Sequence, residues 1–101
     1  MKVIFRKWLN RYAGDGVIAL FPEVPGDRDG FLCQSYEHIG QHGGANYQIV
    51  IRDSNPAKPE EYADLMAELI KRGYDELVVV KHETPHMRAV RKRAAKGTGN
   101  P

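Results

Sequence analysis

This chain has a single cysteine and no long apolar run. Because Cys33 is alone, no intramolecular disulfide can form, and the cysteine pattern gives no support for an oxidising compartment. The apolar segments, such as residues 17–21, are far too short to cross a bilayer. The first residues place charges on both sides of a short apolar patch, where a secretory signal needs a long one. We therefore expect a cytoplasmic protein that makes no contact with membranes.

The sequence also lacks the motifs of common catalytic and metal sites. His38 and His42 are four residues apart, as are His82 and His86, and Cys33 precedes the first pair. Histidines at this spacing can share a metal when they lie on one helix, but neither pair falls on an expected helix. There is no phosphate-binding P-loop, no dinucleotide fingerprint and no Gly-x-Ser-x-Gly elbow. We therefore expect no metal, no cofactor and no catalytic residues.

Charge is divided unevenly along the chain. The net charge is +2, yet residues 81–101 hold six basic side chains and one acidic side chain, a net charge of +5. Residues 1–80 hold nine basic and twelve acidic side chains, a net charge of −3. A mildly acidic body thus precedes a strongly basic end. We expect a single domain over residues 1–84 and a basic, partly helical or disordered tail over residues 85–101.

Alternating apolar and polar residues, rich in β-branched and aromatic types, predict four successive strands. Turn-forming residues separate them, at 10–16, at 23–30 and in a glycine-rich loop over 40–46. The predicted strands cover residues 2–8, 17–22, 31–39 and 47–52. Strands that follow one another through such turns form an antiparallel sheet.

The segment that follows has the pattern of an amphipathic helix and then of a strand. Pro59 suits the first helical turn, and Gly73 is a cap at the other end. One apolar stripe runs along the helix, formed by Tyr62, Leu65, Met66, Leu69 and Ile70. A last strand is predicted over residues 75–81, and its continuous apolar run Leu77–Val80 places it centrally in the sheet.

The expected fold is therefore α+β. An antiparallel four- to five-stranded sheet, in the order β-β-β-β-α-β, carries one main helix on one face and a basic C-terminal tail. The aromatic residues exceed what one short helix can cover, and they include Trp8, Tyr12, Phe31, Tyr36 and Tyr47. We expect the second face of the sheet to be open or buried in a homo-oligomer.

The most unusual segment, residues 33–47, places polar and aromatic side chains around three glycines. Glycines let the backbone approach a ligand and expose N–H groups to an anion, while tyrosines can stack on a base. The candidate ligand-binding residues are Tyr36, His38, Gln41, His42, Gly43, Gly44, Asn46 and Tyr47, with Arg6 and Arg52 as phosphate partners. The alternative is a long hairpin loop whose glycines supply positive φ and whose polar groups satisfy one another.

The basic tail is a second candidate site, for nucleic acid. Its cations resemble those of a phosphate-binding arm, and they are Arg88, Arg91, Lys92, Arg93 and Lys96. No aromatic residue is interleaved with them, so any binding would be independent of base sequence. The opposing interpretation is a solvated, partly helical terminus that aids solubility.

Three segments of the chain carry a resemblance to known proteins: Lys2-Val-Ile-Phe-Arg-Lys-Trp, Val17-Ile-Ala-Leu-Phe-Pro-Glu and Ser35-Tyr-Glu-His-Ile-Gly-Gln-His-Gly-Gly-Ala. Together with Pro59-Glu-Glu-Tyr and Leu77-Val-Val-Val-Lys, they resemble a family of short, uncharacterised proteins of phages and other bacterial mobile elements. The resemblance covers roughly residues 1–82. The first loop and the basic tail depart from it, and it implies no particular site residues.

The resemblance implies a function directed at host machinery, because small phage-borne proteins without catalytic motifs often act there. We expect a non-enzymatic counter-defence protein that binds a nucleotide second messenger or a host defence protein. The second hypothesis is a nucleic-acid-binding accessory protein that uses the tail. The third is a small nucleotide hydrolase with His38 or His42 as general base. In a strand, however, Ser35 and His38 point to opposite faces, so they do not form a nucleophile–base pair.

Overall fold

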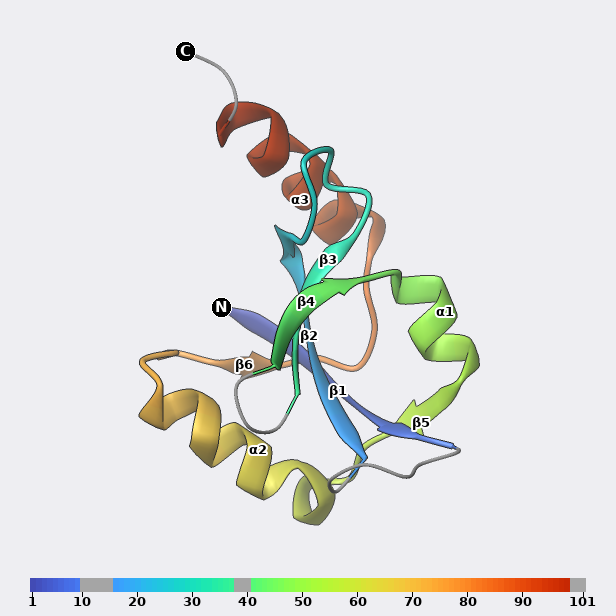
Figure 1. The fold of residues 1–101 in the computed structure, drawn as a ribbon, viewed down its shortest axis with the longest axis vertical. Helices are drawn as coiled ribbons and strands as arrows, with labels where there is room; N and C mark the ends of the chain where they lie inside the picture. Colours follow the sequence, from blue (N-terminus) through green and yellow to red (C-terminus); the bar gives the residue numbers. More distant parts are fainter. Residues whose placement is uncertain (10–15, 38–40, 99–101) are drawn as a thin grey trace.

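The computed structural model describes residues 1–9, 16–37 and 41–98. Its elements, in chain order, are β1 (Lys2–Trp8), β2 (Val17–Pro25), β3 (Cys33–Glu37), β4 (Gln41–Ala45), α1 (Tyr47–Arg52), β5 (Ser54–Pro56), α2 (Pro59–Lys71), β6 (Val78–Val79) and α3 (Pro85–Thr98). Figure 1 shows the strands running through the middle of the molecule, with the three helices placed around them. The expected α+β class with a mostly antiparallel sheet is confirmed.

The strands of the described chain form one sheet in the order β4-β3-β2-β1-β5. All these neighbours are antiparallel, and β6 adds a short parallel pairing to the start of β1. Phe5 pairs with Ala19, Ala19 with Tyr36, and Tyr36 with His42. Directly paired residues share a face of the sheet, so these four side chains form one row across it.

Helix α2 covers the face that carries this row. Leu65 and Leu69 are fully buried in a core cluster with Phe5, and the Tyr62 ring stacks on Phe5 at 4.3 Å between ring centroids. The predicted apolar stripe is therefore the contact surface of the helix. Its last member, Ile70, lies outside the contact, with 55% of its surface exposed.

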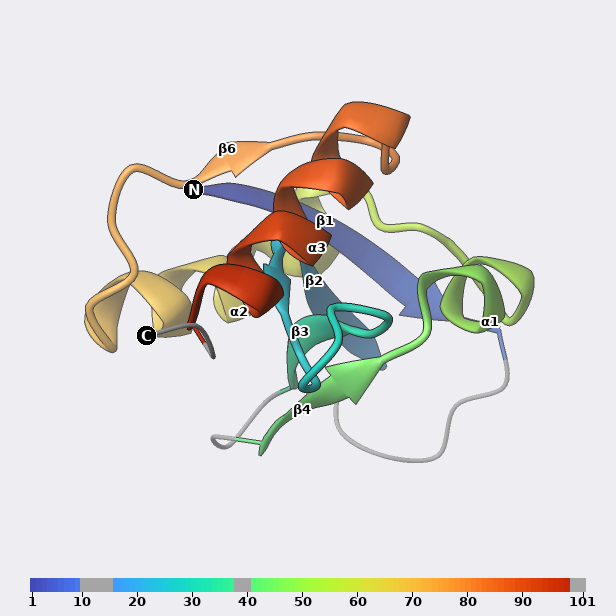
Figure 2. The same ribbon diagram turned by 90° about the horizontal axis from the view of Figure 1, so that it is seen from above.

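The second face, expected to be open or buried in an oligomer, is covered within the chain. Its core cluster of Ile4, Ile18, Leu20 and Cys33 includes Val50 from α1. Helix α3 lies over β2 on the same side (Figure 2). The unexpected cover explains why so many apolar side chains occur on both faces of so small a sheet.

Helix α3 is anchored to the sheet by a buried arginine. Arg91 donates from Nε to the carbonyl oxygen of Gly30 at 2.9 Å and from Nη1 to that of Pro22 at 2.8 Å. It also pairs with the Glu83 carboxylate, and the two side chains are 4% and 2% exposed. The segment after residue 84 is thus a packed helix, and Arg91 is withdrawn from the set of cations available to solvent.

Residues 41–52 differ most from the expectation. The predicted strand over 47–52 is wrong, because this segment is helix α1, and the predicted glycine-rich loop forms strand β4. Asn46 starts the helix, with its side-chain oxygen accepting from the Ile49 N–H at 3.2 Å. The β-branched residues favoured a strand, but the cap and the burial of Val50 outweigh that weak preference.

The last strand is also shorter and more exposed than predicted. Only Val78 and Val79 pair with β1, and both are exposed, so the predicted central strand over 75–81 is wrong. The flanking residues Leu77 and Val80 are the ones that pack, each against a different core cluster. Strand β5 already pairs with the second half of β1, so only the first residues of β1 are left to pair with β6.

Strand β2 continues past Pro22, where the sequence predicted its end, as far as Pro25. Its register against β3 shifts between Phe21 and Pro25, which is where a proline is tolerated within a sheet. Within the described ranges, no helix has both the length and the apolar character needed to cross a bilayer.

Candidate functional site

The structure does not bring the predicted ligand-binding residues into one site, because His42, Gly43 and Gly44 border one pocket and Asn46 and Tyr47 border another. Tyr36 is fully buried, and its hydroxyl donates to the Glu68 carboxylate of α2. It is therefore a core residue that joins the sheet to the helix. His38 lies outside the described residues, and so does the side chain of Gln41.

The two arginines proposed as phosphate partners are engaged elsewhere. Arg6 is buried and donates to the Ser54 hydroxyl at 2.9 Å, to the Ser54 carbonyl at 2.7 Å and to the Ile51 carbonyl at 3.3 Å. Burial lowers the pKa of its guanidinium. Arg52 is exposed and pairs with its neighbour Asp53 at 3.0 Å. Arg6 thus ties α1 and β5 to β1.

Asn46 and Tyr47 belong to the junction between α1 and α3. Asn46 caps α1, and the Tyr47 hydroxyl accepts from the Glu83 backbone N–H at 2.8 Å. These contacts hold the segment before α3 in place. Asn46 and Tyr47 are thus engaged at a different place from the row of side chains that contains His42.

The two adjacent glycines of β4 have different surroundings. A Cβ at Gly44 would lie 2.8 Å from the Gly26 carbonyl oxygen, so glycine is required for the strand to pass this loop. A Cβ at Gly43 would meet only the Ser35 hydroxyl, at 3.8 Å. Gly44 therefore has a packing role, which the sequence does not distinguish from a ligand-binding one.

His42 borders a pocket together with the Tyr74 ring and the Arg72 cation. Its Nε2 atom shares a hydrogen bond with the Tyr74 hydroxyl at 3.1 Å, and the ring planes differ by 22°. The centroids are 6.5 Å apart. The hydrogen bond joins the two rings through their edges with their planes nearly parallel, and this pair of rings is called here the ring platform.

The inner side of the ring platform packs on the core. Tyr74 stacks on Phe21 at 5.2 Å between centroids, and His42 meets the Tyr36 ring edge-on at 4.7 Å. Both contacts come from residues of the face that α2 covers. The buried rings of Phe21 and Tyr36 thus hold the platform in place, while His42 itself is exposed.

Local sequence signals at the end of α2 place Tyr74 and its neighbour Arg72. The helix ends at Lys71, and Gly73 adopts a positive φ of 104° that turns the chain. The Tyr74 N–H then bonds to the Leu69 carbonyl at 3.1 Å, which directs the ring back toward the sheet. The Arg72 guanidinium lies 5.7 Å from the centroid of the Tyr36 ring.

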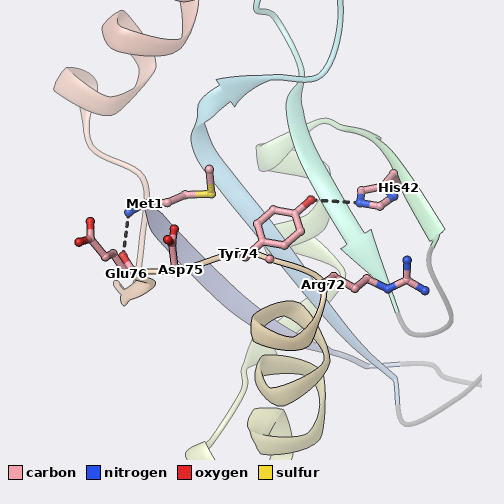
Figure 3. A pocket seen from close by; sticks show the side chains of 7 residues that line it. Met1, His42, Arg72, Tyr74, Asp75 and Glu76 are labelled. Carbon is pink, nitrogen blue, oxygen red and sulfur yellow. Dashed lines mark hydrogen bonds between the residues drawn. The ribbon is translucent and has the colours of Figure 1, made fainter.

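His42, Tyr74 and Arg72 border a pocket of about 570 Å³, called here the platform pocket (Figure 3). Its lining residues are Met1, His42, Arg72, Gly73, Tyr74, Asp75 and Glu76. Arg72 extends along the same side as His42 in the figure, and its Nε lies 3.9 Å from the Glu68 carboxylate. The N-terminal amine closes the other end by donating to the Glu76 carbonyl at 2.8 Å.

The platform pocket combines three kinds of chemistry. A flat aromatic surface accepts a planar ring, and an arginine accepts phosphate or carboxylate. The carboxylates of Asp75 and Glu76 can accept hydrogen bonds from hydroxyl or amino groups. The sequence does not mark Arg72 as a site residue, because a cation is common at a helix C-terminus, and it carries no signal that singles out Tyr74.

A second pocket of about 580 Å³ lies on the opposite face, between Trp8, Val50 and strand β4. The Trp8 indole donates to Glu37 at 3.0 Å, and the Ser35 hydroxyl donates to the Gly43 carbonyl at 3.0 Å. These polar groups satisfy one another. The arrangement lacks a described arginine or lysine, so it is a poorer site for an anionic ligand than the platform pocket.

In the described part of the chain, no three side chains of the histidine, cysteine, aspartate and glutamate types gather as metal ligands. Burial raises the pKa of the Cys33 thiol to about 11, so the thiol is protonated and unreactive at neutral pH.

No family model, no curated protein and no solved structure matches this chain. A function for this chain is therefore inferred from the geometry of its own residues.

Proposed function

We propose that this protein is a non-enzymatic binding protein for a nucleotide and that the platform pocket is its binding site. The observation that carries the proposal is the ring platform of His42 and Tyr74 with Arg72 beside it. A nucleotide combines a planar base with phosphate, which are the two groups that such a surface recognises.

The contacts suggest how the ligand would lie. The base stacks on the exposed side of the platform, and a phosphate reaches Arg72. The ribose hydroxyls then face Asp75 and Glu76, which line the remaining wall. Two carboxylates balance one arginine and the N-terminal amine, so the lining has no net positive charge to attract a highly charged polyphosphate. The ligand class is therefore a nucleotide with few phosphate charges.

The biological role follows from the resemblance to phage and mobile-element proteins and is part of the same proposal. The protein would sequester a nucleotide signal of bacterial immunity and so protect the invading element. A host defence protein that docks over the same pocket is the alternative partner. Hydrolysis is less favoured, since the Nε2 atom of His42 already shares a hydrogen bond with Tyr74.

The test is isothermal titration calorimetry with cyclic mono- and dinucleotides and ADP-ribose derivatives, after a thermal-shift screen. Arg72→Gln is expected to weaken binding by roughly tenfold or more, through loss of a charge-assisted hydrogen bond. His42→Ala removes half of the platform and is expected to weaken binding by roughly threefold to tenfold. Arg52→Gln is the matched control, because Arg52 is also exposed and paired with a nearby carboxylate but lies outside the pocket.

Mass spectrometry of the bound fraction separates sequestration from hydrolysis, because a binding protein releases its ligand unchanged. Equal binding by the wild type, Arg72→Gln and His42→Ala would remove the platform pocket from consideration. Absence of binding to every nucleotide tested would contradict the nucleotide proposal itself.

A further inference from the structure

Helix α3 presents a row of cations that the proposed nucleotide site does not use. Met87, Arg91 and Ala95 are spaced by four residues and are buried, so they form the inner side of the helix. Arg88, Lys92 and Lys96 have the same spacing one position further along. They form a parallel row at the margin of the buried side, about 6 Å apart along the axis.

An exposed aromatic ring lies beside this row. Phe31 is 66% exposed, more than any other large apolar side chain of the described residues. It follows Gly30, whose backbone is so close to α3 that a Cβ there would lie 2.9 Å from the Lys92 Cα atom. Phe31, Arg88 and Lys92 border a common pocket of about 190 Å³. The β2–β3 loop and α3 are side by side in both ribbon views (Figure 1 and Figure 2).

The local charge is positive. Between Pro85 and Thr98 the helix holds no acidic residue. The nearby Glu83 is buried and pairs with Arg91, and it lies 3.4 Å from Arg88. The Arg91–Glu83 pair cancels within the core, so the outer cations of α3 face solvent with little opposing charge.

From these observations we infer that Phe31 and the row Arg88–Lys92–Lys96 form a binding surface for single-stranded nucleic acid. Proteins that bind single strands combine cations that follow the backbone with aromatic side chains on which bases stack. An exposed phenylalanine can stack on an unpaired base but not on one enclosed in a duplex. The exposed amide of Gln48, which borders the same pocket, is placed to bond to the edge of a stacked base.

The sequence of the tail does not predict base stacking, because no aromatic residue lies among the cations of residues 85–101. The fold supplies the missing ring from a loop more than fifty positions earlier. This surface is separate from the platform pocket, since the two share no lining residue. Its failure and the failure of the nucleotide proposal can therefore be told apart.

The test is fluorescence anisotropy with labelled twelve-nucleotide oligo(dT) and oligo(U), a duplex of the same length, and heparin as a polyanion without bases. The intact protein is expected to bind single strands more tightly than duplex or heparin at 50 mM salt. Phe31→Ala is expected to weaken binding by roughly fivefold or more, with an unchanged salt slope, because stacking releases no counterions. Lys92→Gln is expected to weaken binding and to reduce the slope by about 0.7.

Two exposed residues of α2 provide matched controls. Ile70→Ala removes an exposed apolar side chain and Lys71→Gln an exposed cation, and neither is expected to change the affinity. His42→Ala and Arg72→Gln are also expected to leave it unchanged. Undetectable binding of single strands, equal affinity for duplex or heparin, or an unchanged affinity in Phe31→Ala would each overturn the inference.

Discussion

The two faces of the sheet are covered by helices that are attached in different ways. Helix α2 is attached through apolar contacts, in which Leu65 and Leu69 are fully buried. Helix α3 buries the apolar Met87 and Ala95, and between them it is attached through Arg91, which bonds to two backbone carbonyls and pairs with the buried side chain of Glu83. An apolar attachment leaves a periodic signal in the sequence. An attachment through a buried ion pair leaves none, because arginine at an inward position looks like a solvent-exposed residue.

The largest expected effect concerns the ion pair under α3. Glu83→Gln leaves the Arg91 guanidinium buried without a counter-charge, which typically costs about 3–5 kcal/mol. Urea denaturation measures the loss in the free energy of unfolding. The matched control is Glu60→Gln at the exposed start of α2, where we expect a change below about 0.5 kcal/mol.

A double variant sharpens this prediction. Glu83→Gln with Arg91→Met removes both charges and keeps an unbranched side chain in the inward position. We expect it to be more stable than Glu83→Gln alone, because an apolar side chain replaces an unpaired buried charge. A double variant as unstable as the single one would show that Arg91 acts through its carbonyl contacts and not through its charge.

On the α2 face, Leu69→Ala is expected to cost about 3 kcal/mol through lost burial and a residual cavity. Denaturation of this variant is compared with that of Ile70→Ala, the adjacent residue with 55% of its surface exposed, which is expected to change stability by less than about 0.5 kcal/mol. Similar losses for both variants would mean that α2 does not pack on the sheet through the face described.

Cys33 gives the α3 side of the sheet a dependence on pH. Burial raises the pKa of its thiol from 9.0 to about 11, so the folded chain keeps a proton that the unfolded chain releases. The free energy of unfolding therefore falls as the pH rises from about 9 to about 11, by about 2–3 kcal/mol from this group. Denaturation at pH 8 and pH 11 is compared between the wild type and Cys33→Ala. An identical pH dependence in both proteins would contradict the prediction.

The smallest effect concerns the polar contact between β3 and α2. Tyr36→Phe removes the hydroxyl that donates to Glu68 and is expected to cost about 1–2 kcal/mol. Thermal denaturation compares it with Tyr62→Phe, which keeps the stack on Phe5 and is expected to be near neutral. A larger loss from Tyr62→Phe would mean that the hydroxyl of Tyr62, and not that of Tyr36, joins the helix to the sheet.

The elements with strong local signals were predictable. Strand β1 covers residues 2–8 as expected, and α2 begins at Pro59 and ends before Gly73. The errors at residues 41–52 have one origin, because strand propensity and glycine content do not decide the conformation of this segment. In the structure, the Asn46 cap and the close passage of Gly44 over Gly26 decide it instead.

The candidate site was predictable only in part. His42 belongs to the predicted set, but the sequence gives no sign that Tyr74 or Arg72 lies beside it. Tyr74 joins it because α2 ends with Gly73 directing the chain back to the sheet, where Tyr74 meets the Tyr36–His42 pair. That contact depends on strand register and on the position of a helix, neither of which is a local property of the sequence.

The sequence by itself determined the fold class, the amphipathic face of α2 and the concentration of positive charge after residue 84, because each is a property of neighbouring residues. Only the tertiary structure decided which side chains share a surface. It buried Arg91, placed Phe31 beside Lys92 and aligned Tyr74 with His42. The physical reason is that a contact between distant segments forms when their faces are buried together, and burial is decided by the whole chain.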